Sequence, residues 1–124
     1  MGDFRKLETW QIAKKLAVVI YRVTNESAFS KDFGLRDQIR RAVISISSNI
    51  AEGEESGTNK MSIRFFNIAK GSAAEVQSQA EIAFEIGYLN EETLNEILTY
   101  CNQISSKLSK LITYRRNHLT KPQP

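Results

Sequence analysis

The residues of this sequence with the clearest chemical potential are arginines and lysines on predicted helices. Arg40 and Arg41 are adjacent, so in a helix their side chains point about 100° apart, and Arg36 lies one turn earlier on the flank of Arg40. The later helices add six candidates: Arg64, Lys70, Lys107, Lys110, Arg115 and Arg116. Such cations bind the phosphates of RNA or DNA. They also occur solvated or paired with carboxylates, here Asp37 or Glu52, and the sequence leaves both interpretations open.

Residue types suited to catalysis are sparse. The single histidine, His118, lies near the C-terminus, which argues against a Ser-His or Cys-His arrangement. Cys101 lies on an apolar ladder and is predicted to be a core residue. The inward Glu-x-x-His pairs of a di-iron bundle and the glycine-rich phosphate loops are both missing from the sequence. We therefore expect a protein that is not an enzyme and that uses no metal or cofactor.

Composition predicts one soluble domain. The chain has 124 residues, of which 41% are hydrophobic and 25% charged, as in ordinary globular domains. No apolar run approaches the roughly 20 residues that span a bilayer, and the first residues lack the apolar core of a signal peptide. One cysteine makes no internal disulfide, which fits a reducing compartment. We expect a cytoplasmic protein without a membrane partner.

The net charge of +3 is unevenly distributed. Residues Glu75 to Glu96 contain six acidic side chains and no Lys or Arg, whereas residues Lys107 to Pro124 contain five basic side chains and no acid. This asymmetry is typical of a polyanion-binding end, but a solvated bundle surface gives the same pattern. Charge alone does not choose between the two.

Hydrophobic periodicity predicts four helices to position these residues. The first runs from about Leu7 to Thr24. The segment Asn25 to Gly34 reads as a connection whose Phe29 and Phe33 pack against the end of the bundle. The second helix begins near Gly34 or Leu35, with Asp37 in its first turn.

The second helix carries two apolar faces. Its core stripe recurs at steps of three and four residues: Ile39, Val43, Ile46 and Ile50. Ile44 and Ala51 lie on roughly the opposite side, which indicates that another surface of this helix is also covered. Asn49 is predicted to bond to nearby backbone, and Gly53 is predicted to end the helix in a left-handed cap.

The third helix is predicted from Asn59 or Lys60 to Ile86, with Gly87 as its stop. Opposite its core face lie small and polar residues at helical spacing: Asn67, Gly71 and Ala74. A glycine inside a helix costs about 1 kcal/mol relative to alanine. Close approach of another backbone to this stripe would offset that cost.

The fourth helix follows Asn90, a good N-cap, and carries the cleanest apolar ladder of the chain. The pattern fades beyond Tyr114, so residues 117–124 are predicted to be a disordered tail. Short connections favour antiparallel neighbours. The predicted fold is an all-α, antiparallel, up-down-up-down four-helix bundle, formed by residues 1–116 as a single domain.

Four stretches of the sequence resemble one family. The segment from Gln38 to Gly53 (QIRRAVISISSNIAEG) resembles the signature of the 23S rRNA-intervening-sequence proteins, also described as S23-type four-helix bundles. Phe4 to Trp10, Phe65 to Ser72 and Gly87 to Leu89 resemble further motifs of the family. Two positions depart from it, because Ser47 stands where proline is usual and Lys70 where arginine is common. The linker before Gly34 also lacks the usual proline.

The resemblance implies partners that the residues alone do not name. The family is similar to the accessory variability determinant of diversity-generating retroelements, a pentameric, basic, nucleic-acid-binding bundle that works with a reverse transcriptase. It therefore implies a homo-oligomer, with a pentamer favoured, and RNA or DNA as ligand. The residues expected at the oligomer interface are Ile44, Ala51, Asn67, Gly71 and Ala74. The alternative is an interaction scaffold or accessory subunit, bound to a reverse transcriptase or another protein, that makes no direct nucleic-acid contact.

Overall fold

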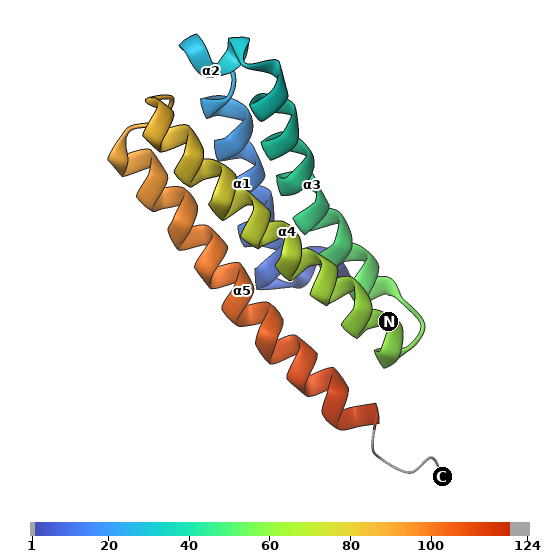
Figure 1. Cartoon of the computed structure of the whole chain (residues 1–124). Coiled ribbons are helices and arrows are strands. Elements are labelled where there is room, and N and C mark those ends of the chain that lie inside the picture. The colour runs from blue at the N-terminus through green and yellow to red at the C-terminus, as the bar shows by residue number, and fades with distance from the viewer. Residues whose placement is uncertain (1, 120–124) are drawn as a thin grey trace.

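The computed structural model of the protein describes residues 2–119 and shows the predicted bundle (Figure 1). Its elements are a short 3₁₀ helix η1 (Phe4–Lys6) and the helices α1 (Glu8–Val23), α2 (Ser27–Lys31), α3 (Phe33–Glu55), α4 (Asn59–Ile86) and α5 (Glu91–Leu119). All regular structure within the described range is helical. The four long helices alternate in direction, which confirms the up-down-up-down arrangement.

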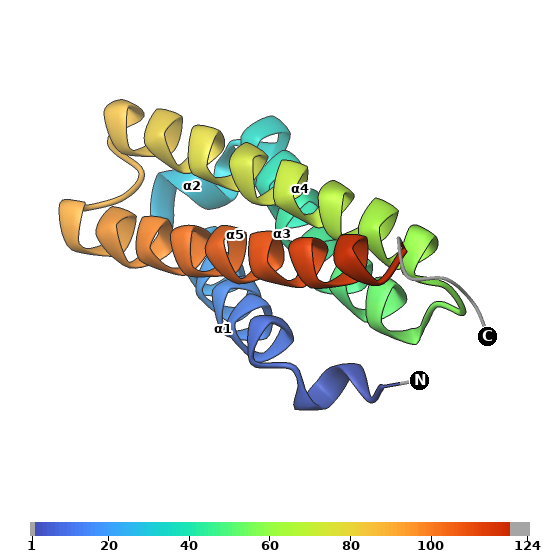
Figure 2. The ribbon, with the colours of Figure 1, turned by 90° about the horizontal axis from the view of Figure 1, so that it is seen from below.

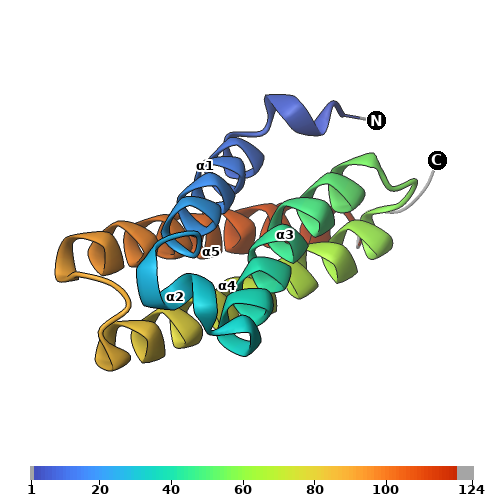
Figure 3. The same cartoon turned by 90° about the horizontal axis from the view of Figure 1, so that it is seen from above.

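Helix α4 lies between α3 and α5, and α1 packs against α3 and α5 to close the bundle. Figures 2 and 3 show α1 crossing α5 obliquely, whereas α4 and α5 run side by side. The α4–α5 hairpin therefore forms one long side of the molecule. Each long helix turns a polar face to solvent, and no helix within residues 2–119 is long and apolar enough to cross a membrane.

The predicted core stripe of α3 is confirmed, because all four of its aliphatic residues are fully buried. Leu16 and Ile20 of α1 and Phe66 of α4 meet it from the neighbouring helices. Burial of this apolar surface is the main stabilising contribution to the fold. Cys101 is also fully buried, as predicted, and desolvation raises the pKa of its thiol to about 12.

The α3–α4 contact depends on Gly53, and the prediction that this glycine ends the helix is wrong. Helix α3 continues to Glu55, and Gly53 is buried inside it. A Cβ atom at Gly53 would lie 2.5 Å from Cε1 and 2.7 Å from Cδ1 of Phe66. The residue is therefore glycine because the Phe66 ring lies directly against the α3 backbone, rather than because the chain turns there.

Small polar residues hold the same two helices together. The Ser72 hydroxyl donates to Oγ of Ser45 at 2.8 Å, and the Ser62 hydroxyl donates to the carbonyl of Gly53 at 2.7 Å. Asn49 donates to the Ser45 carbonyl at 2.8 Å, which confirms its predicted structural role. These bonds satisfy polar groups that close packing removes from water.

Two predicted helix ends at the α4–α5 turn are confirmed. Gly87 caps α4 in the left-handed conformation with φ of 96°, and Oδ1 of Asn90 accepts a hydrogen bond from the Thr93 amide at 2.8 Å. The start of α3 has a cap that the sequence reading missed, because Asp32 accepts from the Leu35 amide at 3.1 Å.

The predicted connection between the first two long helices contains the short helix α2. Phe29 is buried, as predicted, and its ring stacks on Tyr88 with 5.0 Å between centroids. Tyr88 donates its hydroxyl proton to Asp32 at 2.9 Å, and this bond raises the pKa of Tyr88. The same prediction is wrong for Phe33, which is 63% exposed because it begins α3 on the outer side.

The C-terminal boundary also differs from the prediction. Helix α5 extends to Leu119, so residues 117–119 of the predicted tail are helical. At this end the His118 ring lies 4.1 Å from the Tyr114 ring, and His118 Nδ1 lies 2.7 Å from the Tyr114 carbonyl oxygen. The rest of the predicted tail, residues 120–124, lies outside the described residues.

Candidate nucleic-acid interface

The α4–α5 hairpin is divided into an acidic end and a basic end. Residues 59–74 and 97–119 together contain seven Lys and Arg and no Asp or Glu, whereas residues 75–96 contain six Glu and no Lys or Arg. The two basic segments are far apart in sequence, but the turn at Gly87 makes the helices antiparallel. The fold therefore brings both basic segments together at the open end of the hairpin.

Contacts between the helices fix which residues are neighbours there. The Lys70 ammonium donates to Oγ of Ser109 at 2.8 Å, and Arg115 donates to Oδ1 of Asn59 at 2.9 Å. In this register Lys60 and Arg64 of α4 lie alongside residues 110–116 of α5. We define the basic open end as Lys60, Arg64, Lys70, Lys110 and Arg116.

The cations of the basic open end keep their charge available. Lys60, Arg64, Lys110 and Arg116 are exposed, and none of them forms an ion pair with another residue of the 2–119 range. Lys70 is half-buried, but its partner Ser109 is a neutral hydroxyl, so the positive charge is not cancelled. The basic open end therefore carries five cations that no carboxylate of the described residues compensates.

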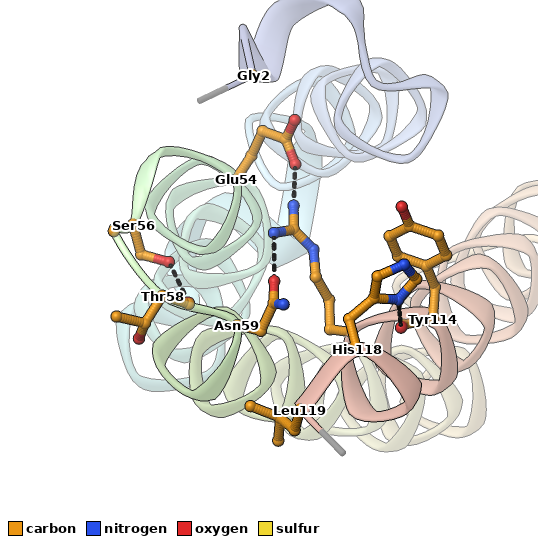
Figure 4. A pocket seen from close by; sticks show the side chains of 10 residues that line it. Gly2, Glu54, Ser56, Thr58, Asn59, Tyr114, His118 and Leu119 are labelled. Carbon is orange, nitrogen blue, oxygen red and sulfur yellow. Dashed lines mark hydrogen bonds and ion pairs between the residues drawn. The ribbon is translucent and has the colours of Figure 1, made fainter. Parts of the chain in front are cut away.

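Two other predicted candidates on α5 are neutralised within the chain. Nη2 of Arg115 pairs with Oε1 of Glu54 at 3.0 Å, and Nη1 donates to Asn59, so Arg115 ties α5 to the end of α3 and the start of α4 (Figure 4). These three residues line a pocket of about 620 Å³ at this end of the bundle. Lys107 pairs with Glu8, and the hydrogen bond from Lys107 holds the pKa of the Glu8 carboxyl below its usual range.

The three predicted arginines of α3 do not join this group. Arg36 pairs with the adjacent Asp37 at 3.0 Å, and Arg40 donates to the Thr24 hydroxyl at 2.8 Å. Arg41 is exposed and forms no ion pair within the described residues. All three lie near the start of α3, at the end of the bundle opposite to the start of α4 (Figure 1). The nine predicted cations therefore fall into three groups: four in the basic open end, two on α5 that pair with carboxylates, and three near the start of α3.

A second surface lies between α1 and α3, where the predicted interface residue Ile44 is found. Here a groove of about 430 Å³ has an apolar floor made by Trp10, Ala17, Val18, Tyr21 and Ile44. Ile44 is 43% exposed. We call this surface the α1–α3 groove. The prediction that Ile44 faces away from the core is confirmed, whereas Ala51 is only half-buried and does not line the groove.

The predicted small-residue stripe of α4 lies on a different face. Asn67, Gly71 and Ala74 are exposed, and a Cβ atom at Gly71 would meet nothing in the described part of the chain within 4 Å. Sequence reading missed four exposed apolar side chains on the outer side of the same helix: Met61, Ile68, Ile82 and Ile86. The spacing of seven between residues 61, 68, 75 and 82 was the available signal.

Two of three comparisons with known proteins give a match, and both agree with this architecture. A family model described as 23S rRNA-intervening sequence protein matches residues 5–110. A solved structure from Bacteroides thetaiotaomicron VPI-5482, a protein of unknown function from the S23 ribosomal protein family, is 26% identical with a TM-score of 0.77. That match covers 84% of this chain and 97% of that chain. A search of curated proteins finds no significant match. Because the family model spans most of the chain, the protein belongs to the 23S rRNA-intervening sequence protein family.

Proposed function

We propose that this protein is a non-enzymatic, self-associating bundle of the cytoplasm that binds RNA or DNA through the phosphate backbone. The observation that supports this most directly is the basic open end, where five cations without carboxylate partners gather on the α4–α5 side. Exposed cations release condensed counterions from a nucleic acid when they neutralise its phosphates. Contacts of this kind fix position rather than read sequence, so we propose a ligand defined by charge and shape.

The proposal sets an expected salt dependence. If most of the five cations contact phosphates, the slope of log K against log salt is about −4 for one protomer on duplex DNA. Several copies in one assembly present the same patch repeatedly, which raises avidity without new contacts. Binding is therefore expected to be strong near 50 mM salt and much weaker near 200 mM.

The test is fluorescence anisotropy with generic labelled RNA and DNA duplexes over this salt range. Reversing three exposed charges, in the variant Arg64→Glu, Lys110→Glu and Arg116→Glu, is expected to abolish measurable binding. The matched control reverses three exposed charges elsewhere: Lys15, Lys31 and Arg41. Both variants have the same net charge, so a larger loss in the first locates the interface. Absence of binding near 50 mM salt, or equal loss in both variants, contradicts the proposal.

A second function is favoured by the exposed apolar surfaces. The α1–α3 groove and the outer face of α4 are the kind of surface through which a scaffold or accessory subunit contacts a protein. By the family resemblance we propose a homopentamer as the assembly and a reverse transcriptase as one class of protein partner. Light scattering after size-exclusion chromatography tests the first point, since a pentamer has five times the 14.1 kDa of one chain.

A further inference from the structure

Two apolar surfaces of the chain carry opposite charges, and they lie on different faces. One is the α1–α3 groove. The other is the outer side of α4, which we call the α4 ridge and define as Ile68, Glu75 and Ile82. We infer that the α4 ridge of one copy docks into the α1–α3 groove of a second copy. This inference rests on the self-association included in the proposed function, and it identifies the two surfaces that meet.

The groove combines an apolar floor with a basic rim. Lys14 and Arg22 line it together with the floor residues, and Nζ of Lys14 lies 5.3 Å from the centre of the Trp10 ring. The Arg40 guanidinium lies 4.7 Å from the centre of the Tyr21 ring. Neither Lys14 nor Arg22 pairs with a carboxylate of residues 2–119. The groove is therefore suited to an apolar segment that also carries negative charge.

The α4 ridge has these properties. Ile68 and Ile82 are 44% and 49% exposed, and Glu75 lies midway between them at steps of seven residues. At a rise of about 1.5 Å per residue the ridge is roughly 21 Å long, and the groove from Trp10 to Tyr21 is roughly 17 Å long. The ridge can therefore fill the groove while its central carboxylate meets the basic rim.

Small residues beside the ridge allow close docking. Gly71 lies one turn from Ile68 on the same outer face, and a Cβ atom there would meet no atom of residues 2–119 within 4 Å. Without a side chain at Gly71, a neighbouring helix can approach the α4 backbone closely. The predicted stripe of Gly71 and Ala74 would then lie against the second copy.

Because two different surfaces pair, the contact is heterologous. A pair of copies still has one unoccupied groove and one unoccupied ridge, to which further copies can bind. Such contacts build closed rings, or filaments when the rotation does not close. Self-pairing is less favourable electrostatically. Two grooves face to face bring the Lys14 and Arg22 side chains of both copies together, and two ridges centred on Glu75 oppose the same carboxylates.

The decisive experiment mixes two variants that are each expected to be monomeric. Ile44→Asp places a charge in the groove, and Ile82→Asp places one on the ridge. Each variant keeps one intact surface, so a 1:1 mixture is expected to form a heterodimer of twice 14.1 kDa and nothing larger. Light scattering after size-exclusion chromatography measures the masses, and circular dichroism confirms that both variants are folded. Phe33→Asp is the control, since Phe33 is exposed but lies on neither surface, and it is expected to assemble like the wild type.

Three results would overturn the inference: a monomeric wild type at micromolar concentration, a variant that still assembles fully, or a mixture that stays monomeric. The second result indicates that another surface mediates assembly, and the last indicates a two-fold contact in which both positions of each copy take part. The nucleic-acid proposal is judged separately, by anisotropy of wild type and of the Arg64, Lys110 and Arg116 charge-reversal variant. A monomer that binds RNA with the expected salt dependence refutes only the docking. An assembly formed as described that binds no nucleic acid refutes only the ligand.

Discussion

The two faces of α4 carry similar small and apolar residues, but one face packs against α3 and the other is exposed. On the face towards α3, the small residue Ser72 bonds to Ser45, and the Phe66 ring lies against Gly53. On the outer face, Gly71 is likewise small and Ile68 likewise apolar, but a Cβ atom at Gly71 would meet no described residue within 4 Å, and Ile68 is 44% exposed. Small residues at helical spacing therefore mark a surface for close packing without saying whether the partner is the same chain or another molecule. Substitutions on the two faces are therefore expected to change the free energy of unfolding by different amounts and with opposite signs.

The largest difference is expected between two adjacent arginines of α5. Arg115→Met leaves Glu54, whose side chain is only 13% exposed, without its cation. We expect the free energy of unfolding to fall by about 3 kcal/mol, measured by urea denaturation. Arg116→Met removes an exposed charge, so its expected effect on stability is within about 0.5 kcal/mol while the salt slope of nucleic-acid binding falls by about 1. Equal stability of the two variants would show that the ion pair between Arg115 and Glu54 does not stabilise the fold.

Gly53→Ala tests the close contact on the inner face. The added methyl group overlaps the fully buried Phe66 ring, so the ring or the two helices must shift to accommodate it. We expect a loss of about 2 kcal/mol in the free energy of unfolding, although alanine is the better helix former. Gly53→Ala combined with Phe66→Leu provides space for the methyl group, so its loss should be smaller than the sum of the two single losses. Additive losses would contradict the proposed contact.

A smaller effect is expected from one hydroxyl on the inner face. Ser72→Ala removes the donor to Ser45 in a buried position and is expected to cost about 1 kcal/mol. Ser78→Ala is the matched control on the outer side of the same helix, where the residue is exposed. Thermal unfolding of the two variants measures the difference, and an equal shift in Tm would show that the inner bond contributes nothing.

The smallest effect, and one of opposite sign, is expected at Gly71. Alanine has space there within the chain, so Gly71→Ala in the monomeric Ile44→Asp background should stabilise the fold by about 0.8 kcal/mol. In the otherwise wild-type chain the same methyl group should weaken assembly, because it holds the neighbouring copy away from α4. Urea denaturation and light scattering measure the two effects. A loss of monomer stability would show that a methyl group at position 71 clashes with other residues of the same chain.

Most of the fold could be predicted from local patterns. The core stripe of α3, the cap at Gly87 and the cap at Asn90 each depend on residues within a few positions, and all three were predicted correctly. Gly53 was misread because a glycine near the end of a helical pattern has two explanations, a left-handed cap or close packing. Only the position of Phe66, on another helix, distinguishes them.

The sequence predicted that the candidate interface is basic, but it did not predict which basic residues form it. The sequence identifies the nine cations and the absence of acids after Glu96. It does not show that Arg115 points to Glu54 whereas Arg116 points to solvent, although a rotation of about 100° per residue means that adjacent residues must differ. The sequence also does not show that Lys60 and Arg64 lie at the same end of the hairpin as Lys110, because nearly fifty residues separate them along the chain.

By itself, the sequence determined four amphipathic helices, their antiparallel order and the family, since periodicity, caps and motifs are properties of neighbouring residues. Only the tertiary structure decided which cations remain uncompensated and which small residues are already packed. It also decided that the second apolar surface of α3 is a groove shared with α1. The physical reason is that charge neutralisation and close packing act through space between helices, so they depend on rotation and register that local patterns leave free.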